Sequence, residues 1–119
     1  MTKTLTILFR TGSMMAMDAN VAVKLAKAAT AKGYKVHMFG YGEGVTAVKK
    51  GQKPKRFPNV GDELEEAAKQ GVTQAICETC FAARGFERGE EIASAKVGSL
   101  TNDLFRFVSE SDRFVTIAR

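Results

Sequence analysis

The chain alternates short apolar runs with longer segments in which apolar residues recur at helical spacing. The first run, Thr4–Phe9, is almost continuously apolar and carries two threonines, a residue type that favours strands. Continuous apolar runs are typical of parallel strands that are covered on both faces. Similar short runs predict strands over Tyr34–Phe39, Val72–Cys77 and Arg113–Ile117. The pattern leaves Ile92–Leu100 open between a small strand and a loop.

Helical spacing follows the first and second predicted strands. Asp18 is placed to cap a helix that ends at Gly33, because Asp is a common N-cap residue and Gly a common C-cap residue. The residues expected on its inner face are Val21, Val23, Leu25, Ala28 and Ala29, with Lys24 and Lys27 outside. Another helix is predicted to open at Asn59–Asp62 and to end at Gly71, with Leu64, Ala67 and Ala68 inward.

Two shorter helices complete the pattern. One is predicted over Thr79–Ala83, ending near Gly85. The other is capped by Thr101–Asp103 and is expected to turn Leu104, Phe105 and Val108 inward. Alternating strands and helices with short connections predict an α/β fold with a mainly parallel open sheet of about five strands and helices on both faces. The expected architecture is therefore a Rossmann-like three-layer sandwich.

Composition agrees with one globular domain over residues 1–119, since 45% of the residues are hydrophobic and only 2 are proline. The N-terminal residues are interrupted by threonines and contain neither a long apolar stretch nor a small-residue cleavage site. The sequence thus predicts neither a signal peptide nor a membrane span. We expect a cytoplasmic protein with no membrane partner.

Charge is concentrated in one segment. The net charge of +5 arises from 18 Lys and Arg against 13 Asp and Glu, and Lys49–Pro58 contains five basic residues and no acidic one. This segment follows Gly40, Gly42 and Gly44, which predict a long and mobile loop. It fits a solvated loop, a docking patch for an acidic partner or small anion, or a phosphate-backbone footprint. No helix-turn-helix or RNA-binding pattern accompanies it, so no nucleic acid partner is expected.

The candidate chemistry lies in Cys77-Glu78-Thr79-Cys80, a CxxC motif where a predicted strand ends and a helix begins. Ligands usually bind at this edge of an α/β sheet. A thiol at a helix N-terminus meets unpaired N–H groups that favour the thiolate, and Arg84 adds a positive charge while Glu78 opposes the effect. The spacing allows a reversible disulfide, or a persulfide resolved by the neighbouring thiol.

The two cysteines also fit roles outside sulfur transfer. They are compatible with buried structural residues, or with a thioredoxin-type oxidoreductase, although that fold places the motif after an early strand. Zinc needs two further ligands, and the lone histidine, His37, lies within a predicted strand, so a zinc site requires sharing between subunits. We expect no metal and no organic cofactor. Met14, Met15 and Met17 fit either core packing or an apolar pocket near the strand ends.

The sequence resembles the DsrE/DsrF/TusD-like family of sulfur-relay proteins over nearly its whole length. The resemblance rests on Phe39–Val45, on Gly71–Cys77 followed by Ala82–Gly85, and on Ser111–Val115, together with the N-terminal strand and the glycine-containing loop after it. It implies that Cys77 carries sulfur as a persulfide between donor and acceptor proteins, with Cys80 and Arg84 as further candidate site residues. Cys80 departs from the single-thiol pattern of the DsrE and TusD subunits.

The resemblance also bears on assembly. Family members form trimers and hexamers, some of them from homologous subunits, which implies a homo-oligomer or a hetero-oligomer for this chain. A non-catalytic oligomeric or regulatory subunit of the same fold, or a CxxC thiol-disulfide redox protein, is the alternative to a sulfurtransferase, because a fold does not fix a function.

Overall fold

The computed structural model describes residues 2–12 and 17–118. These residues form a five-stranded sheet in the order β4-β3-β2-β1-β5, in which every neighbouring pair of strands is parallel. The strands are β1 (Thr4–Phe9), β2 (Lys35–Gly40), β3 (Thr73–Cys77), β4 (Ala95–Gly98) and β5 (Arg113–Ile117). The predicted α/β class is confirmed, and the ambiguous segment before Leu100 contains the short strand β4.

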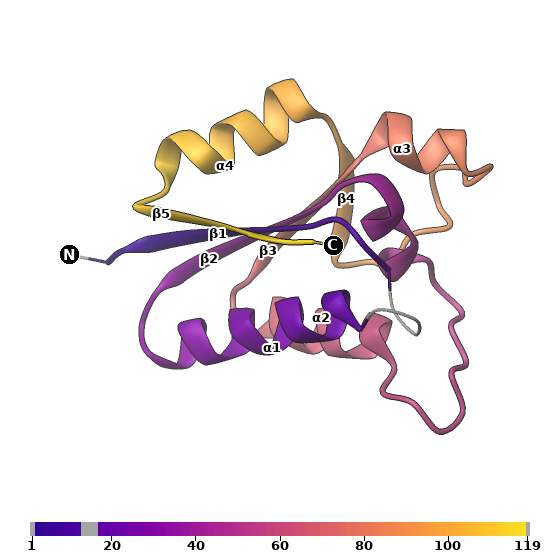
Figure 1. The fold of residues 1–119 in the computed structure, drawn as a ribbon, viewed down its shortest axis with the longest axis horizontal. Coiled ribbons are helices and arrows are strands. Elements are labelled where there is room, and N and C mark those ends of the chain that lie inside the picture. The colour runs from indigo at the N-terminus through magenta and orange to yellow at the C-terminus, as the bar shows by residue number, and fades with distance from the viewer. Residues whose placement is uncertain (1, 13–16, 119) are drawn as a thin grey trace.

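Helices cover both faces of the sheet, as Figure 1 shows. Helices α1 (Asp18–Ala31) and α2 (Val60–Lys69) lie together on one face, and α3 (Glu78–Ala83) and α4 (Phe105–Glu110) lie on the other. A 3₁₀ helix, η1 (Gly42–Val48), follows β2, and a π-helical turn, η2 (Leu100–Leu104), leads into α4. Within the described ranges, no helix is long and apolar enough to cross a membrane.

Helix α1 packs on the sheet through small side chains. Ala19, Ala22, Val23 and Ala26 are buried, whereas Val21 and Leu25, like Ala28, lie at the surface. The prediction that Val21, Leu25 and Ala28 face inward was wrong. Alanines occur on several sides of this helix, so the apolar pattern does not show which side is buried. The predicted cap is also shifted by one residue. Met17 is the N-cap, and Asp18 lies in the first turn, where its negative charge suits the helix dipole.

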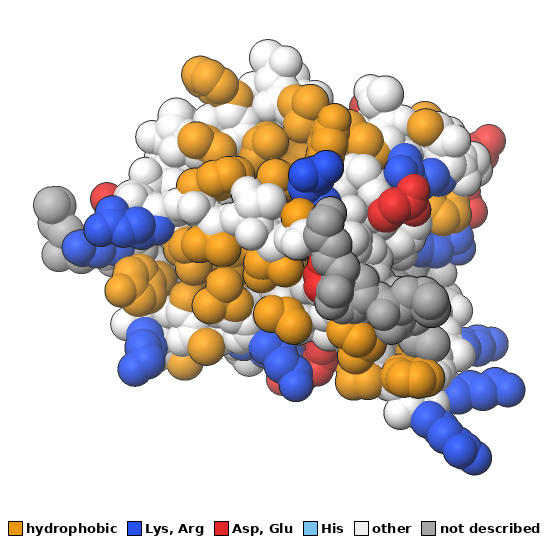
Figure 2. Space-filling view, viewed as in Figure 1, with side chains coloured by type: hydrophobic (Ala, Val, Ile, Leu, Met, Phe, Trp, Pro, Cys, Tyr) orange, Lys and Arg blue, Asp and Glu red, His pale blue; other side chains and the backbone are white. Residues whose placement is uncertain are grey.

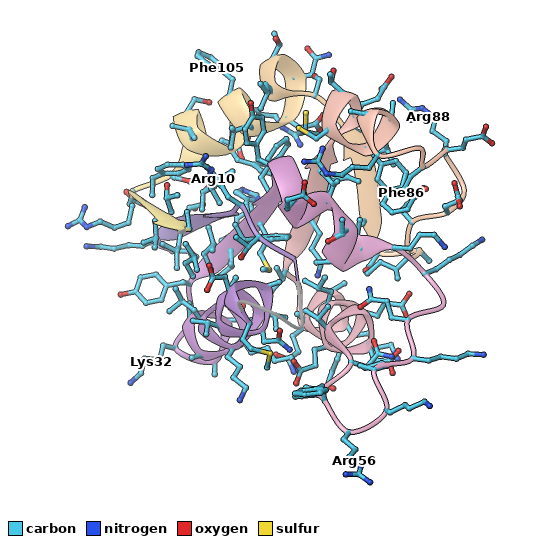
Figure 3. The ribbon with its side chains drawn as sticks, turned by 45° about the vertical axis from the view of Figure 1, so that its right-hand side comes forward. Arg10, Lys32, Arg56, Phe86, Arg88 and Phe105 are labelled. Atoms are coloured by element: carbon cyan, nitrogen blue, oxygen red, sulfur yellow. The ribbon has the colours of Figure 1, made fainter. Side chains whose placement is uncertain are left out.

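Helix α4 presents a different face to the sheet from the predicted one. Phe107 is buried, while Phe105 is 71% exposed and points away from the molecule in Figure 3. Val108 is also exposed, and Leu104 is only partly buried. The predicted cap at Thr101–Asp103 lies within the preceding turn η2, whose N-cap is Ser99; the Ser99 hydroxyl accepts a hydrogen bond from the Asn102 amide. The intervening π turn has wider hydrogen-bonded rings than an α-helix, so it shifts the later residues away from α spacing.

The glycine-rich segment after β2 is more ordered than its sequence predicts. Instead of one long mobile loop, η1 forms and buries Val45, Ala47 and Val48 in the core. Gly44 permits this packing, because a Cβ at this position would overlap the Phe9 carbonyl. The irregular connection is thus confined to the residues between η1 and Asn59, which caps α2 by accepting a hydrogen bond from the Asp62 amide.

Candidate functional site

Both cysteines lie where β3 gives way to α3, as predicted. Cys77 is the last residue of β3 and the N-cap of α3, and its Sγ accepts a hydrogen bond from the Cys80 amide at 3.5 Å. The first N–H groups of a helix have no partner within the helix, so this amide is free to point at the sulfur. Cys77 is 4% exposed and Cys80 is half-buried, and both are free thiols.

A cavity of about 470 Å³ opens beside the two thiols. It lies at the carboxyl ends of β2, β3 and β4, the edge at which α/β proteins usually bind ligands. Its lining consists of Tyr41, Cys77, Glu78, Thr79, Cys80, Gly98, Ser99, Leu100 and Thr101. Cys77 therefore faces a cavity although little of its own surface is exposed.

Gly42 brings a backbone donor to the second thiol. Its amide lies 3.3 Å from Cys80 Sγ, in hydrogen-bonding contact. The residue has a φ of +61°, a left-handed conformation that suits glycine. Because β2 and β3 are neighbours in the sheet, the segment after Gly40 lies beside the start of α3. No local pattern predicts this contact, which joins residues 38 positions apart.

Arg84 holds the segments around the thiols together. Its Nε and Nη2 donate to one carboxylate oxygen of Glu43 at 3.0 and 2.5 Å, and its Nη1 donates to the Cys80 carbonyl at 2.9 Å. The hydrogen bond from Arg84 lowers the pKa of Glu43, and the same bond raises the pKa of Arg84. Glu43 was not among the predicted site residues. Arg84 acts on the thiols mainly through the backbone that it fixes.

The environment of Cys80 opposes the predicted thiolate. Burial raises the pKa of Cys80, and its side-chain hydrogen bond with Cys77 acts in the same direction. The Gly42 amide and the charge of Arg84 lower the pKa, but by less, so the net shift is upward. The expectation that a helix N-terminus favours the thiolate is therefore not met at Cys80.

A buried carboxylate supports the opposite wall of the cavity. Asp103 is 2% exposed and accepts hydrogen bonds from the Ser99 amide at 2.9 Å and from Lys96 Nζ at 2.8 Å. Burial alone would raise the pKa of Asp103, but Lys96 and the Ser99 amide outweigh it and lower the pKa. Gly98 lies beside Cys77 in the sheet register, and a Cβ there would overlap the Asp103 carboxylate.

The remaining candidate residues lie away from this arrangement. His37 stacks on Phe107 between β2 and α4, with a ring separation of 4.3 Å. No group of three or more potential His, Cys, Asp or Glu metal ligands occurs in residues 2–12 and 17–118. Glu78 is the exception, because it lines the cavity, and its carboxylate pairs with Arg88 at the surface. Met17 is half-buried at the start of α1, and Met14 and Met15 lie outside the described residues.

The segment Lys49–Pro58, here called the basic loop, projects at the carboxyl end of the sheet on the side of α2, the opposite face from α3 (Figure 1). Lys50, Lys53, Lys55 and Arg56 are exposed. Figure 2 shows Lys and Arg side chains extending into solvent there, and Arg56 points away from the protein in Figure 3. Lys49 differs from these four residues, since it is half-buried and its Nζ lies 3.9 Å from Glu90 Oε1.

A second surface feature is apolar. The edge strand β5 exposes Phe114 and Val115, and a groove of about 500 Å³ runs between β5 and α1, bordered by Leu5, Leu25 and Tyr34. Figure 2 shows hydrophobic side chains gathered over this region and over α4. We refer to β5 with the adjoining surfaces of α1 and α4 as the β5 face.

The parallel sheet with a thiol pair at its carboxyl edge places the chain among small α/β proteins with a cysteine site. The sequence profile of the DsrE/DsrF-like family matches residues 3–117. A relative from Methanopyrus kandleri, the uncharacterized protein MK0008, is 33% identical over 97 residues, which are 82% of this chain and 79% of the relative. The chain therefore belongs to the DsrE/DsrF-like family.

Solved structures support the same fold. The YchN protein of Escherichia coli matches with a TM-score of 0.88 and 25% identity, over 98% of this chain and 99% of YchN. MTH1491 of Methanobacterium thermoautotrophicum, a protein of unknown function, matches with a TM-score of 0.77 and 13% identity, over 95% of this chain and 98% of that one. The predicted family and fold are thus confirmed.

Proposed function

We propose that this chain is a sulfur carrier that holds sulfane sulfur as a persulfide on Cys77 and passes it to a partner protein. The observation that carries the proposal is the position of Cys77 at the carboxyl edge of the sheet, facing a cavity and hydrogen-bonded to a helix amide. Membership of the DsrE/DsrF-like family supports it.

The proposed chemistry is thiol–persulfide exchange. The Cys77 thiolate attacks the outer sulfur of a donor persulfide, a new S–S bond forms, and the donor thiolate leaves with the electron pair of the broken bond. An acceptor cysteine then attacks the outer sulfur on Cys77 in the same way and regenerates the Cys77 thiolate. The sulfane sulfur keeps its oxidation state in both steps, so the transfer needs no external oxidant. The Cys80 amide is placed to stabilise charge on Cys77 Sγ.

The basic loop supports the approach of protein partners. It lies at the same carboxyl end of the sheet as the cysteine cavity, although on the side of α2, and its exposed cations attract an acidic donor or acceptor to that end of the molecule. Long-range attraction of this kind accelerates encounter more than it strengthens the final complex.

We also propose that copies of this chain, or homologous subunits, associate through the β5 face. This face combines the free edge of a strand with exposed Phe114, Val115 and Phe105. Native proteins commonly cover such edges and such apolar patches with another chain. Association through the strand β5 would leave the cysteine cavity accessible, because β5 is one edge strand of the sheet and the cavity lies near the other, β4.

The carrier proposal is tested by sulfur loading. Inorganic polysulfide is added to the reduced protein, excess reagent is removed, and intact mass is measured. We expect added sulfur on Cys80→Ser and none on Cys77→Ser. Loading of Cys77→Ser to the same extent as Cys80→Ser would contradict the assignment of Cys77, and the absence of loading on both variants would contradict the carrier function.

One observation favours a second candidate, a non-catalytic subunit of the same fold. The surface of Cys77 is 4% exposed, and a carrier thiol must be reached by its donor. Alkylation of the native protein separates the candidates. Modification of Cys77 by a small reagent that enters the cavity supports the carrier, whereas a Cys77 that reacts only after unfolding supports the non-catalytic subunit.

A further inference from the structure

We infer that Cys80 resolves the Cys77 persulfide, so that the chain can release sulfide as well as pass sulfur on. The inference rests on the proposed function, since it requires sulfane sulfur on Cys77. It assigns to the second thiol an activity that a single-thiol carrier does not have: reduction of bound sulfane sulfur to hydrogen sulfide at the expense of two cysteine thiols.

The first support is the local geometry of the pair. Cys77 is the N-cap and Cys80 the third residue of α3, so both side chains emerge on the same turn. Cys77 Sγ lies 3.5 Å from the backbone nitrogen of Cys80, so the first sulfur is next to the residue that carries the second thiol. The two side chains also line the same cavity. A disulfide between them therefore needs little movement of the backbone.

The second support is the donor aimed at Cys80. The Gly42 amide, 3.3 Å from Cys80 Sγ, stabilises negative charge on the sulfur that must attack. Arg84 fixes this arrangement from both sides, because it binds the Cys80 carbonyl and the carboxylate of Glu43, the residue after Gly42. We assign Glu43 and Arg84 as positioning residues that keep α3 and η1 in register.

The step balances without a further reactant. The Cys80 thiolate attacks Cys77 Sγ, the Cys77–Cys80 disulfide forms, and the bond from Cys77 Sγ to the outer sulfur breaks. The outer sulfur leaves with the bonding electron pair as hydrosulfide. The sulfane sulfur is reduced to sulfide, and the two cysteine sulfurs are oxidised to the disulfide. A small or protein dithiol then reduces the disulfide by two thiol–disulfide exchanges, which restores both thiols and allows a new cycle.

The same geometry predicts a pH dependence. The groups around Cys80 are the Cys77 thiol, the Gly42 amide, Arg84 and, through Arg84, Glu43, and the titratable side chains of Tyr41 and Glu78 line the same cavity. Burial and the Cys77 side chain raise the pKa of Cys80, so the attacking thiolate is scarce at neutral pH. Sulfide release is therefore expected to accelerate by about tenfold for each pH unit below that pKa, because the thiolate fraction rises by this factor.

The experiment compares wild type with Cys80→Ser and Cys80→Ala after loading with inorganic polysulfide and removal of excess reagent. Released sulfide and intact mass are followed over time without added reductant. We expect wild type to release sulfide at least tenfold faster than either variant and to end with two hydrogens less than the reduced chain. Both variants should keep their added sulfur.

A matched pair tests the positioning residues. Glu43→Gln removes the charge that holds Arg84, whereas Glu65→Gln removes a half-buried carboxylate on α2, on the opposite face of the sheet from α3. Glu43→Gln loosens η1 and with it the Gly42 amide, which lowers the pKa of Cys80, so this variant should release sulfide more slowly and its pH profile should shift to higher pH. Glu65→Gln should leave the rate and the pH profile unchanged. An unchanged pH profile in Glu43→Gln would overturn the positioning role.

Two outcomes would overturn the resolving role, and they are distinguishable. If wild type and the Cys80 variants retain added sulfur equally long, the resolving role of Cys80 is wrong while the carrier function stands. If the Cys80 variants take up no sulfur at all, although circular dichroism shows them folded, the proposed function fails and this inference fails with it.

Discussion

Gly98 lies in the wall of the cysteine cavity, directly against a buried carboxylate. A Cβ at Gly98 would overlap the carboxylate of Asp103, which the Ser99 amide and Lys96 hold in a buried position. Gly98→Ala should therefore lower the free energy of unfolding by about 1–3 kcal/mol, a typical cost of overpacking. Urea denaturation measures this change.

Combining Gly98→Ala with Asp103→Ala tests whether the contact with Asp103 causes the loss of stability. In an Asp103→Ala background the overlapping carboxylate is absent, so Gly98→Ala should then cost clearly less than in wild type. An equal cost in both backgrounds would show that Gly98 is required for a reason other than its contact with Asp103.

At the residue scale, local sequence rules predicted part of the site. The placement of Cys77 and Cys80 followed from an apolar run that ends at a helix start, a pattern within a few neighbouring residues. The Gly42 and Glu43 contacts join positions 38 and 41 residues apart, and only the pairing of β2 with β3 brings them together. No local pattern in one sequence carries that information.

At the scale of elements, the contact between β2 and α4 contains a titratable group. His37 is 3% exposed, stacks on Phe107, and has its Nε2 3.2 Å from Glu110. Burial lowers the pKa of His37, helped by the charges of Lys35 and Arg106, and Glu110 only partly offsets the shift. The folded state therefore binds a proton at His37 less readily than the unfolded chain does.

The sign of the stability change follows from this difference. Protonation favours the unfolded chain, so the free energy of unfolding should fall as the pH drops below about 6.5, the ordinary pKa of imidazole. His37→Phe keeps a ring against Phe107 and removes the titration. Urea midpoints measured between about pH 7.5 and 5.5 should decline for wild type and stay nearly flat for the variant. An equal decline in both would assign the pH dependence to other groups.

The presence of a strand or helix was easier to predict from the sequence than the face that a helix turns toward the sheet. Strands β1, β3 and β5 could be predicted because apolar β-formers occur there in short continuous runs. The faces of α1 and α4 could not, because the alanines of α1 mark no single stripe and the π turn before α4 shifts its spacing. Phe105 and Val108 are consequently at the surface, and they form part of the β5 face.

At the scale of the whole molecule, the β5 face should determine the assembly. Light scattering coupled to gel filtration should give a mass several times 12.9 kDa for wild type. Phe114→Glu places a charge on the β5 face and should reduce the mass. Phe57→Glu makes the same change at an exposed phenylalanine of the basic loop and should leave the mass unchanged. A monomeric wild type at micromolar concentration would contradict self-association.

The basic loop should influence the rate of transfer rather than stability. Replacement of Lys50, Lys53 and Lys55 by Gln should slow loading from an acidic persulfidated protein by about tenfold at low salt, and the difference should shrink as salt screens the charges. Replacement of Lys24, Lys35 and Lys69 by Gln changes the net charge equally at exposed positions elsewhere and is the control. Equal rates for both triple variants at every salt concentration would leave the loop without a role in docking.

The central claim is that sulfane sulfur resides on Cys77, and mapping the loaded protein tests it most directly. Cys80→Ser is loaded with inorganic polysulfide, alkylated, digested, and sequenced by mass spectrometry. Every chain retains one thiol, so the added sulfur has a single cysteine on which to reside. We predict a peptide in which one sulfur atom lies between Cys77 and the alkyl group. A Cys77 peptide that carries the alkyl group directly, with no added sulfur at any polysulfide concentration, would contradict the claim.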